Sequence, residues 1–155
     1  MSYLLSKYDI KLSDIALLVF PIVLGLGLVS IVVRKETICG KKPKLQPPGW
    51  VFGTVWGQLY TLMGISIFFY WRKSGRKTTI PFYLFIIGVI LLQLWWILFN
   101  KICAPKYAFI SLVLLAVFFL VITLSFYKTS NVATFCLIPL LGWLSFASYL
   151  TYETI

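Results

Sequence analysis

The sequence predicts an all-α integral membrane protein, a single domain over residues 1–155 built as a bundle of five transmembrane helices. The first observation is composition: 61% of the 155 residues are hydrophobic and 12% are charged, whereas a soluble domain carries about 25% charged residues. The second is that the charges fall in short clusters separated by long uncharged tracts. Each tract reaches the roughly 18 to 20 residues that cross a bilayer as a helix. A soluble enzyme and a disordered chain are therefore excluded.

The uncharged tracts give the expected spans and their links. The spans are placed at about 12–33, 49–71, 79–100, 106–127 and 131–152. The first is too long for the apolar region of a secretory signal and no Ala-x-Ala cleavage pattern follows it, so we expect it to be retained. The later links are short, which makes consecutive helices antiparallel neighbours. The loop 34–48 is longer, as lids often are.

The net charge of +10 comes from 14 basic and 4 acidic residues. On a soluble chain it would suggest a nucleic-acid partner, but here the basic residues flank the spans, so no nucleic acid is expected. Five crossings put the termini on opposite sides of the membrane. The basic residues then divide seven against seven, so the positive-inside rule does not choose the orientation.

Residue types exclude most catalytic and metal chemistry. The chain has no histidine, and its four acidic residues lie at the ends or edges of the spans. We therefore expect no metal site, no Ser-His-Asp nucleophile and no intramembrane carboxylate of a proton-coupled pump. Cys39 and Cys103 fall on the same predicted side, so a bridge is geometrically possible. The odd count, with Cys136, favours free thiols.

Aromatic residues at membrane depth are the most informative feature. Phe52, Trp56 and Tyr60 recur at i, i+4 and i+8, which places them on one face of a helix. Trp95 and Trp143 also lie several residues inside their spans, where an indole N–H needs a partner. Core packing is the simplest interpretation of the spacing. Aromatic side chains with no charge among them also suit a pocket for a flat, largely apolar ligand.

Small residues on the second span indicate close helix packing. Gly53 and Gly57 form a G-x-x-x-G pattern, and Gly64 follows seven residues later on the same face. Such faces let helices approach closely, within one subunit or between two. The pattern is common by chance in glycine-bearing spans, so it is weak evidence for a dimer.

Three blocks of sequence resemble the signatures of the translocator protein family, also called tryptophan-rich sensory proteins or peripheral benzodiazepine receptors. The first block begins at Lys42-Pro43, continues through Pro47-Pro48-Gly49-Trp50 to Trp56, and ends at Gly64. The second block is Trp95-Trp96-Ile97-Leu98-Phe99, and the third runs from Pro139 to Ala147. The family patterns are K-P-x-W-x-P-P with W-x-x-x-P-[IV]-W and L-Y-x-x-M-G, W-x-x-[IL]-F, and P-Y-L-x-W-[LV]-x-F-A. The similarity covers essentially the whole chain in order.

The resemblance implies a five-helix bundle, usually a homodimer, around a cavity that the first loop closes. It implies binding of tetrapyrroles such as protoporphyrin IX or haem, and of sterols and benzodiazepine-type drugs, with no obligatory cofactor. The implied pocket comprises Phe52, Val55, Trp56, Tyr60, Trp95, Tyr107, Ile110, Leu114, Trp143, Phe146, Ala147 and Leu150. The implied lid includes Lys42, Pro43, Pro47 and Pro48.

Several positions depart from the family pattern and point to a divergent ligand preference. Leu45 replaces a loop tryptophan, and Thr54 replaces the proline before Trp56. Leu92 stands where asparagine is usual, with Gln93 adjacent as a possible substitute. The last two departures are Tyr107 for a pocket tryptophan and Thr151 for an asparagine.

Three functions stay open. The first is a receptor or carrier-like protein for porphyrin, sterol or drug-like ligands. The second is a weak, light-dependent porphyrin-degrading enzyme, which the resemblance places at Trp56 and Trp143. The third is a lipid-facilitating structural membrane protein. The resemblance implies the mitochondrial outer membrane for an animal-like protein and another cell or organelle membrane otherwise.

The basic residues of the loop have two possible roles. Lys41, Lys42 and Lys44 either meet the propionates of a bound porphyrin or anchor the helix end at anionic headgroups.

Overall fold

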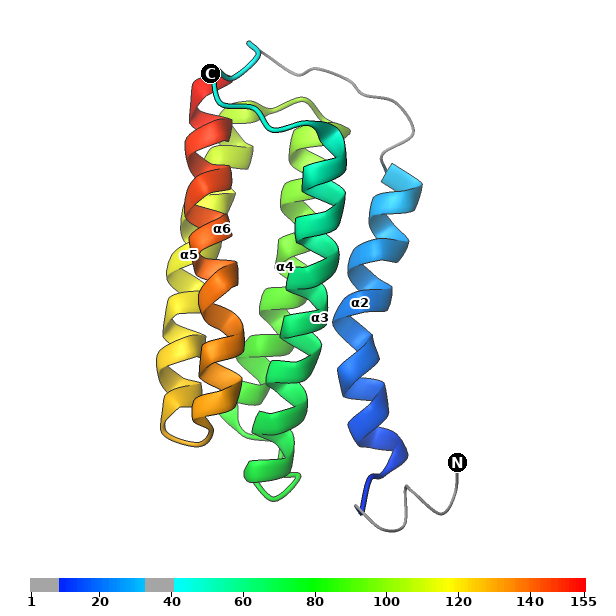
Figure 1. Cartoon of the computed structure of the whole chain (residues 1–155). Coiled ribbons are helices and arrows are strands. Elements are labelled where there is room, and N and C mark those ends of the chain that lie inside the picture. The colour runs from blue at the N-terminus through cyan, green and yellow to red at the C-terminus, as the bar shows by residue number, and fades with distance from the viewer. Residues whose placement is uncertain (1–8, 33–40) are drawn as a thin grey trace.

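The computed structural model describes residues 9–32 and 41–155 (Figure 1), with backbone alone for positions 28–32. Positions 1–8 and 33–40 lie outside this description, so the predicted lid is described only from Lys41 onward. Secondary structure in the described residues is helical, without strands.

The five described helices each lie on one of the tracts that the charges delimit. They are α2 (Leu12–Val32), α3 (Gly49–Lys73), α4 (Ile80–Asn100), α5 (Pro105–Tyr127) and α6 (Asn131–Glu153). Proline precedes α3 at Pro48 and begins α5 at Pro105, because its fixed φ suits the first turn and its missing N–H is not needed there. The Ser130 hydroxyl caps α6 by accepting the N–H of Ala133.

Four of the described helices, α3 to α6, are long and apolar enough to cross a membrane. The apolar stretch of α2, Leu12–Gly27, is shorter. The all-helical architecture is that of a multi-pass membrane protein, while a fifth crossing by α2 stays a prediction.

The helices form a ring in the order α2, α3, α6, α5 and α4, with α4 returning to α2. Figure 1 shows them side by side along one axis. We call the end that holds segment 41–48 and the C-terminus the lid end. The opposite end, with the turns at 74–79 and 128–130, is the base end.

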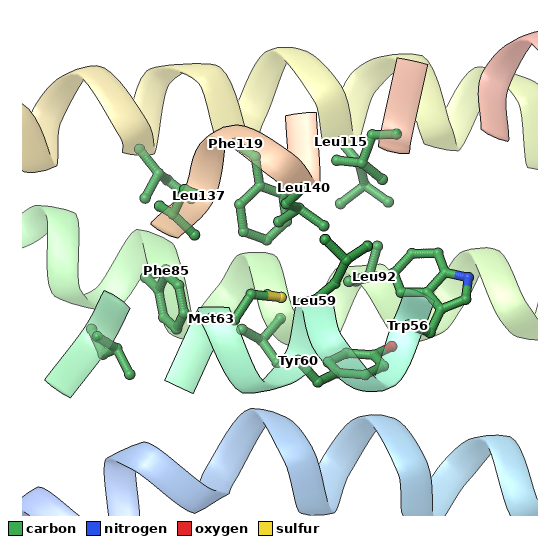
Figure 2. Packing of buried hydrophobic residues seen from close by; sticks show 14 of the residues in the cluster. Trp56, Leu59, Tyr60, Met63, Phe85, Leu92, Leu115, Phe119, Leu137 and Leu140 are labelled. Atoms are coloured by element: carbon green, nitrogen blue, oxygen red, sulfur yellow. The ribbon is translucent and has the colours of Figure 1, made fainter. Parts of the chain in front are cut away.

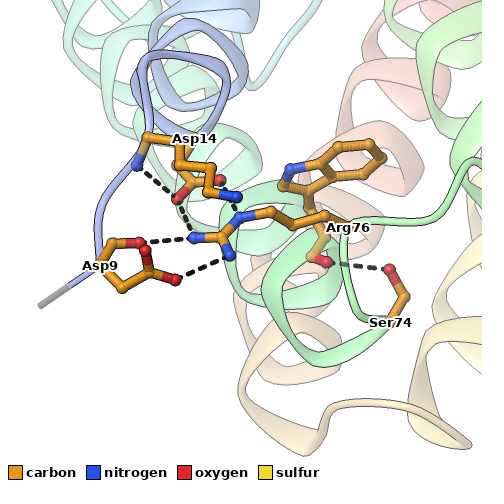
Figure 3. Close-up of polar contacts among 6 residues, drawn as sticks. Asp9, Asp14, Ser74 and Arg76 are labelled. Atoms are coloured by element: carbon orange, nitrogen blue, oxygen red, sulfur yellow. Dashed lines mark hydrogen bonds and ion pairs between the residues drawn. The ribbon is translucent and has the colours of Figure 1, made fainter.

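An ion-pair network fixes the start of α2 to the turn between α3 and α4 at the base end (Figure 3). Arg76 donates from Nε to Asp14 Oδ1 at 3.1 Å and from Nη2 to Asp14 Oδ2 at 2.8 Å, and its Nη1 lies 3.0 Å from Asp9 Oδ2. The buried Asp14 also accepts the Lys11 N–H at 3.0 Å. Hydrogen bonds to Asp14 and Asp9 hold the pKa of the Arg76 guanidinium above its ordinary value.

Stacked rings and hydrogen-bonded hydroxyls form the core of the base half, the part of the bundle nearer to the base end. Tyr70 stacks on Phe126 with ring centroids 4.0 Å apart, and its hydroxyl lies 2.7 Å from Thr79 Oγ1. Ser66 donates to the carbonyl of Ala133 at 2.7 Å, which joins α3 to α6. Most buried polar side chains of the base half therefore have a hydrogen-bond partner within the described residues.

Glycines allow α2 and α3 to cross closely. A Cβ atom at Gly64 would overlap the backbone carbonyl oxygen of Leu18, and one at Gly25 would overlap the ring of Tyr60. A side chain at Gly64 would force the two helices apart, whereas one at Gly25 would require the ring of Tyr60 to move.

The cysteines differ from the sequence expectation at one described position. Cys136 is a free thiol, whereas Cys103 is disulfide-bonded. The expectation of free thiols is therefore wrong for Cys103, because an odd number of cysteines leaves one thiol over without preventing a pair.

Candidate functional site

Phe52, Trp56 and Tyr60 form an aromatic stripe on α3. The stripe faces the interior of the lid half, the part of the bundle nearer to the lid end. Trp56 is 2% exposed and Tyr60 is fully buried, while Phe52, one turn nearer the lid end, is half-buried. Figure 2 shows Trp56 and Tyr60 next to each other, with Leu92 of α4 close by. The helical period that aligned these residues in the sequence also aligns them in space.

Rings from α4 and α6 meet this stripe and form one aromatic cluster. Trp56 contacts Tyr60, Trp95, Trp96 and Trp143 at centroid separations of 5.6, 5.7, 5.8 and 6.4 Å. The aromatic cluster comprises Phe52, Trp56, Tyr60, Trp95, Trp96, Phe99, Trp143 and Phe146.

The aromatic cluster lies below the lid end, at membrane depth. At a rise of about 1.5 Å per residue, Trp56 is roughly 10 Å from the start of α3 and Trp95 roughly 8 Å from the end of α4. Trp143 lies roughly 15 Å from the end of α6 by the same measure. A ligand among these rings would be within reach of segment 41–48.

Several polar groups in the aromatic cluster have no hydrogen-bond partner among the described residues. They are the indole N–H groups of Trp56, Trp95, Trp96 and Trp143. The side-chain carbonyl of Gln93, whose amide nitrogen donates to Tyr60, also has no partner among the described residues. A buried donor or acceptor without a partner costs about 1 to 3 kcal/mol, and lipid offers no hydrogen bond in exchange. These groups are suited to a molecule that enters with acceptor atoms and a donor.

The rings of the aromatic cluster lie within contact distance of one another. Two hollows lie elsewhere, on the outside of the bundle. One, of about 460 Å³, is lined by α2 from Ala16 to Gly27. The other, of about 630 Å³, lies between Leu26 of α2 and the Gly53–Leu62 part of α3. Neither hollow is lined by a ring of the aromatic cluster.

The structure brings together most of the residues that the resemblance implied on α3, α4 and α6. Besides the rings, Ala147 is 2% and Leu150 is 5% exposed. Val55 is half-buried and packs against the core.

The three implied residues on α5 lie apart from the aromatic cluster. Tyr107, Ile110 and Leu114 are 69%, 52% and 65% exposed. The face of α5 that packs inward carries Ala108 and Leu112 instead. The pocket as inferred from sequence thus divides into an interior part and an outward-facing part.

Segment 41–48 is joined to the end of α6 by a group of hydrogen bonds that we call the latch. The Lys44 N–H donates to Glu153 Oε2 at 2.9 Å, and the Lys41 N–H donates to the Thr154 carbonyl at 3.2 Å. Glu153 also accepts the Tyr149 hydroxyl at 2.8 Å. The latch holds the described part of the lid across the lid end (Figure 1).

The predicted lid residues differ in exposure. Lys42 and Pro48 are exposed, whereas Pro43 and Pro47 are half-buried. The side chains of all three candidate lysines, Lys41, Lys42 and Lys44, are open to solvent or headgroups.

The three glycines of the second span have different surroundings. Gly64 contacts the backbone of α2, whereas a Cβ atom at Gly53 or Gly57 would meet nothing within 4 Å. The latter two border the larger hollow with Gln58 and Thr61.

Sequence reasoning did not place three residues that the structure brings to the site. Trp96 and Phe99 belong to the aromatic cluster, and Glu153 carries the latch. Phe99 follows Trp95 by one helical turn, a spacing that could have indicated it. No local pattern signals Glu153, since its loop partner is 109 positions away.

The fold and the aromatic cluster define a multi-pass membrane protein with a tryptophan-rich interior near one surface. Comparison with known proteins agrees, since the sequence profile of the TspO/MBR family matches residues 16–155. The chain belongs to the TspO/MBR family and is an integral membrane protein.

Individual relatives are similar over most of their length. The human translocator protein is 32% identical over 115 residues, covering 72% of this chain and 68% of the relative. A tryptophan-rich protein TspO from Chlorobaculum tepidum is 33% identical over 115 residues, covering 72% of each chain. A protein of the same name from Bacillus cereus is 28% identical over 145 residues, covering 88% of this chain and 92% of the relative.

Proposed function

We propose that this protein is a receptor or carrier-like membrane protein that binds tetrapyrroles such as protoporphyrin IX, and also sterols or benzodiazepine-type molecules, among the aromatic residues of the lid half. In this proposal α2 is a fifth crossing and segment 41–48 is the lid. The single observation that supports it is that the buried indole N–H groups of Trp56, Trp95 and Trp143 have no hydrogen-bond partner in the described part of the chain. A flat ligand would stack on the rings and supply acceptors for these donors.

A titration of the purified chain in detergent with protoporphyrin IX tests this function. Saturable, stoichiometric quenching of tryptophan fluorescence is expected. Trp143→Ala should weaken binding by about two- to tenfold through loss of ring contact, with unchanged far-UV helicity. Trp50→Ala is the matched control, because Trp50 is 72% exposed at the start of α3. Quenching without saturation would leave a lipid-facilitating or structural role.

A second candidate function, light-dependent porphyrin degradation, has one observation in its favour. The two tryptophans to which the resemblance assigns this reaction, Trp56 and Trp143, lie with ring centroids 6.4 Å apart. Loss of porphyrin absorbance that needs light and both residues would support an enzyme. Binding that leaves the absorbance stable under illumination would support a receptor.

A further inference from the structure

Gln93 places a side-chain amide in the interior of the lid half, where hydrogen bonds to two neighbours fix its orientation. It is 4% exposed, on α4, and roughly 10 Å from the lid end of that helix at the usual helical rise. Its Nε2 donates to the Tyr60 hydroxyl at 3.3 Å and to the Val89 carbonyl at 3.2 Å. Both amide hydrogens are therefore used, and the side-chain carbonyl Oε1 has no partner among the described residues.

The orientation of the Gln93 amide follows from its neighbours. A backbone carbonyl can only accept a hydrogen bond, so the group facing the Val89 carbonyl must be the amide NH₂. Turning the amide over would bring two carbonyl oxygens together. Oε1 is thus an acceptor that the described residues leave unpaired, next to Tyr60 and therefore beside Trp56.

We propose that Gln93 selects the ligand of this site by accepting a hydrogen bond from an O–H or N–H group on the end of the ligand that enters first. The inference rests on the proposed ligand-binding function and names the class more closely: a rigid, apolar molecule with one donor at its inner end, such as the hydroxyl of a sterol. An unpaired carbonyl in a water-poor site favours a molecule that carries a donor over an isostere that lacks it.

Neighbouring groups complete the complementarity of the site. The indole N–H groups are donors only, so they match acceptor atoms on the ligand and leave Gln93 as the acceptor for a ligand donor. The exposed lysines of segment 41–48 lie at the lid end, where the outer part of a bound ligand would emerge.

The test uses two sterols that differ in one hydrogen-bond donor. Cholesterol and its 3-methyl ether share one ring system, but only cholesterol donates. Each is titrated directly into the full chain, with tryptophan fluorescence as the readout, and is then tested as a competitor of protoporphyrin IX. Wild-type protein should prefer cholesterol by about three- to tenfold, the net effect of one hydrogen bond.

Two variants separate Gln93 from general effects on the bundle. Gln93→Met keeps the length of the side chain but not the amide, so it should bind both sterols equally. Gln58→Met is the matched control, because Gln58 is exposed on α3, and it should keep the preference.

The outcomes decide the inference and the proposed function separately. Equal affinity for the two sterols in wild type, or a preference that survives Gln93→Met, overturns the role of Gln93. Porphyrin binding with which neither sterol competes overturns it as well. The wild-type comparison alone is decisive if Gln93→Met fails to fold. Cholesterol preference with no saturable porphyrin binding would support Gln93 and remove the tetrapyrrole part of the proposed function.

Discussion

At the base end, Ser66 and Tyr70 pair their hydroxyls with groups on another helix or turn, and Arg76 binds a buried carboxylate. In the lid half, the buried indole N–H groups of Trp56 and Trp143 have no hydrogen-bond partner among the described residues. One bundle therefore contains an interior with most of its polar groups paired and another with several unpaired. Proteins depart from full pairing mainly at functional sites, so we propose that the base half contributes mainly stability and the lid half the binding.

The largest expected effect is on stability and comes from the base half. Phe126 is fully buried and stacks between Tyr70 and Phe85. Phe126→Ala should lower the free energy of unfolding by about 3 to 5 kcal/mol, measured by denaturation in detergent. Porphyrin affinity of the folded fraction should stay the same. A large loss of affinity without loss of stability would remove the division between the halves.

The next effect separates two glycines of α3. Gly64→Ala should destabilise the protein by about 1 to 3 kcal/mol, because the added methyl group meets the backbone of α2. Gly57→Ala is the control and should not destabilise the protein, because its Cβ would meet no described atom within 4 Å and alanine favours a helix more than glycine does. If the Gly53 and Gly57 face is the interface of the homodimer that the family resemblance implies, Gly57→Leu should reduce the dimer fraction on crosslinking while the monomer remains stable.

A smaller effect concerns the latch. Glu153→Ala removes the acceptor for the Lys44 N–H and the Tyr149 hydroxyl, so porphyrin should dissociate about three- to tenfold faster, as for the loss of one or two exposed hydrogen bonds. Stopped-flow fluorescence measures this rate. Glu153→Gln keeps an acceptor oxygen and should lie between wild type and Glu153→Ala. Equal release rates in all three proteins would leave the loop without a role in closure.

The smallest effect concerns the lysines of segment 41–48. Replacing Lys41, Lys42 and Lys44 with Gln should weaken the dicarboxylate protoporphyrin by about two- to threefold but leave cholesterol unchanged, because exposed ion pairs contribute little. High salt should shrink the difference. Lys73→Gln with Lys77→Gln, at the base end, is the control. Equal changes for both ligands would make the lysines headgroup anchors.

Sequence alone supplied the helices and the α3 stripe, because charge clusters delimit membrane helices and a helical period identifies a face. The outward orientation of Tyr107 and Leu114 could not be predicted in the same way. Helix α5 is apolar on every side, and lipid is as apolar as the core, so no pattern distinguishes the face toward lipid from the face toward the bundle.

The different roles of the glycines were also beyond sequence reasoning. Gly53, Gly57 and Gly64 share one spacing pattern, but only the position where α2 crosses decides which glycine is needed within the subunit. The contact between Lys44 and Glu153 depends likewise on the closed ring of helices. Long-range placement, which single-sequence patterns do not encode, accounts for each of these differences.

One measurement tests the division of the bundle most directly: the affinity for protoporphyrin IX of tryptophan-to-phenylalanine variants at its two ends. This change keeps a ring and removes the N–H. Trp71, near the base end, also has an indole N–H without a partner among the residues that the structure describes, and it provides the matched control. We predict that Trp95→Phe combined with Trp143→Phe weakens protoporphyrin IX binding by about tenfold, as for two lost hydrogen bonds. The Trp71→Phe variant should bind protoporphyrin IX like wild type. Equal affinities in the two variants would contradict this prediction.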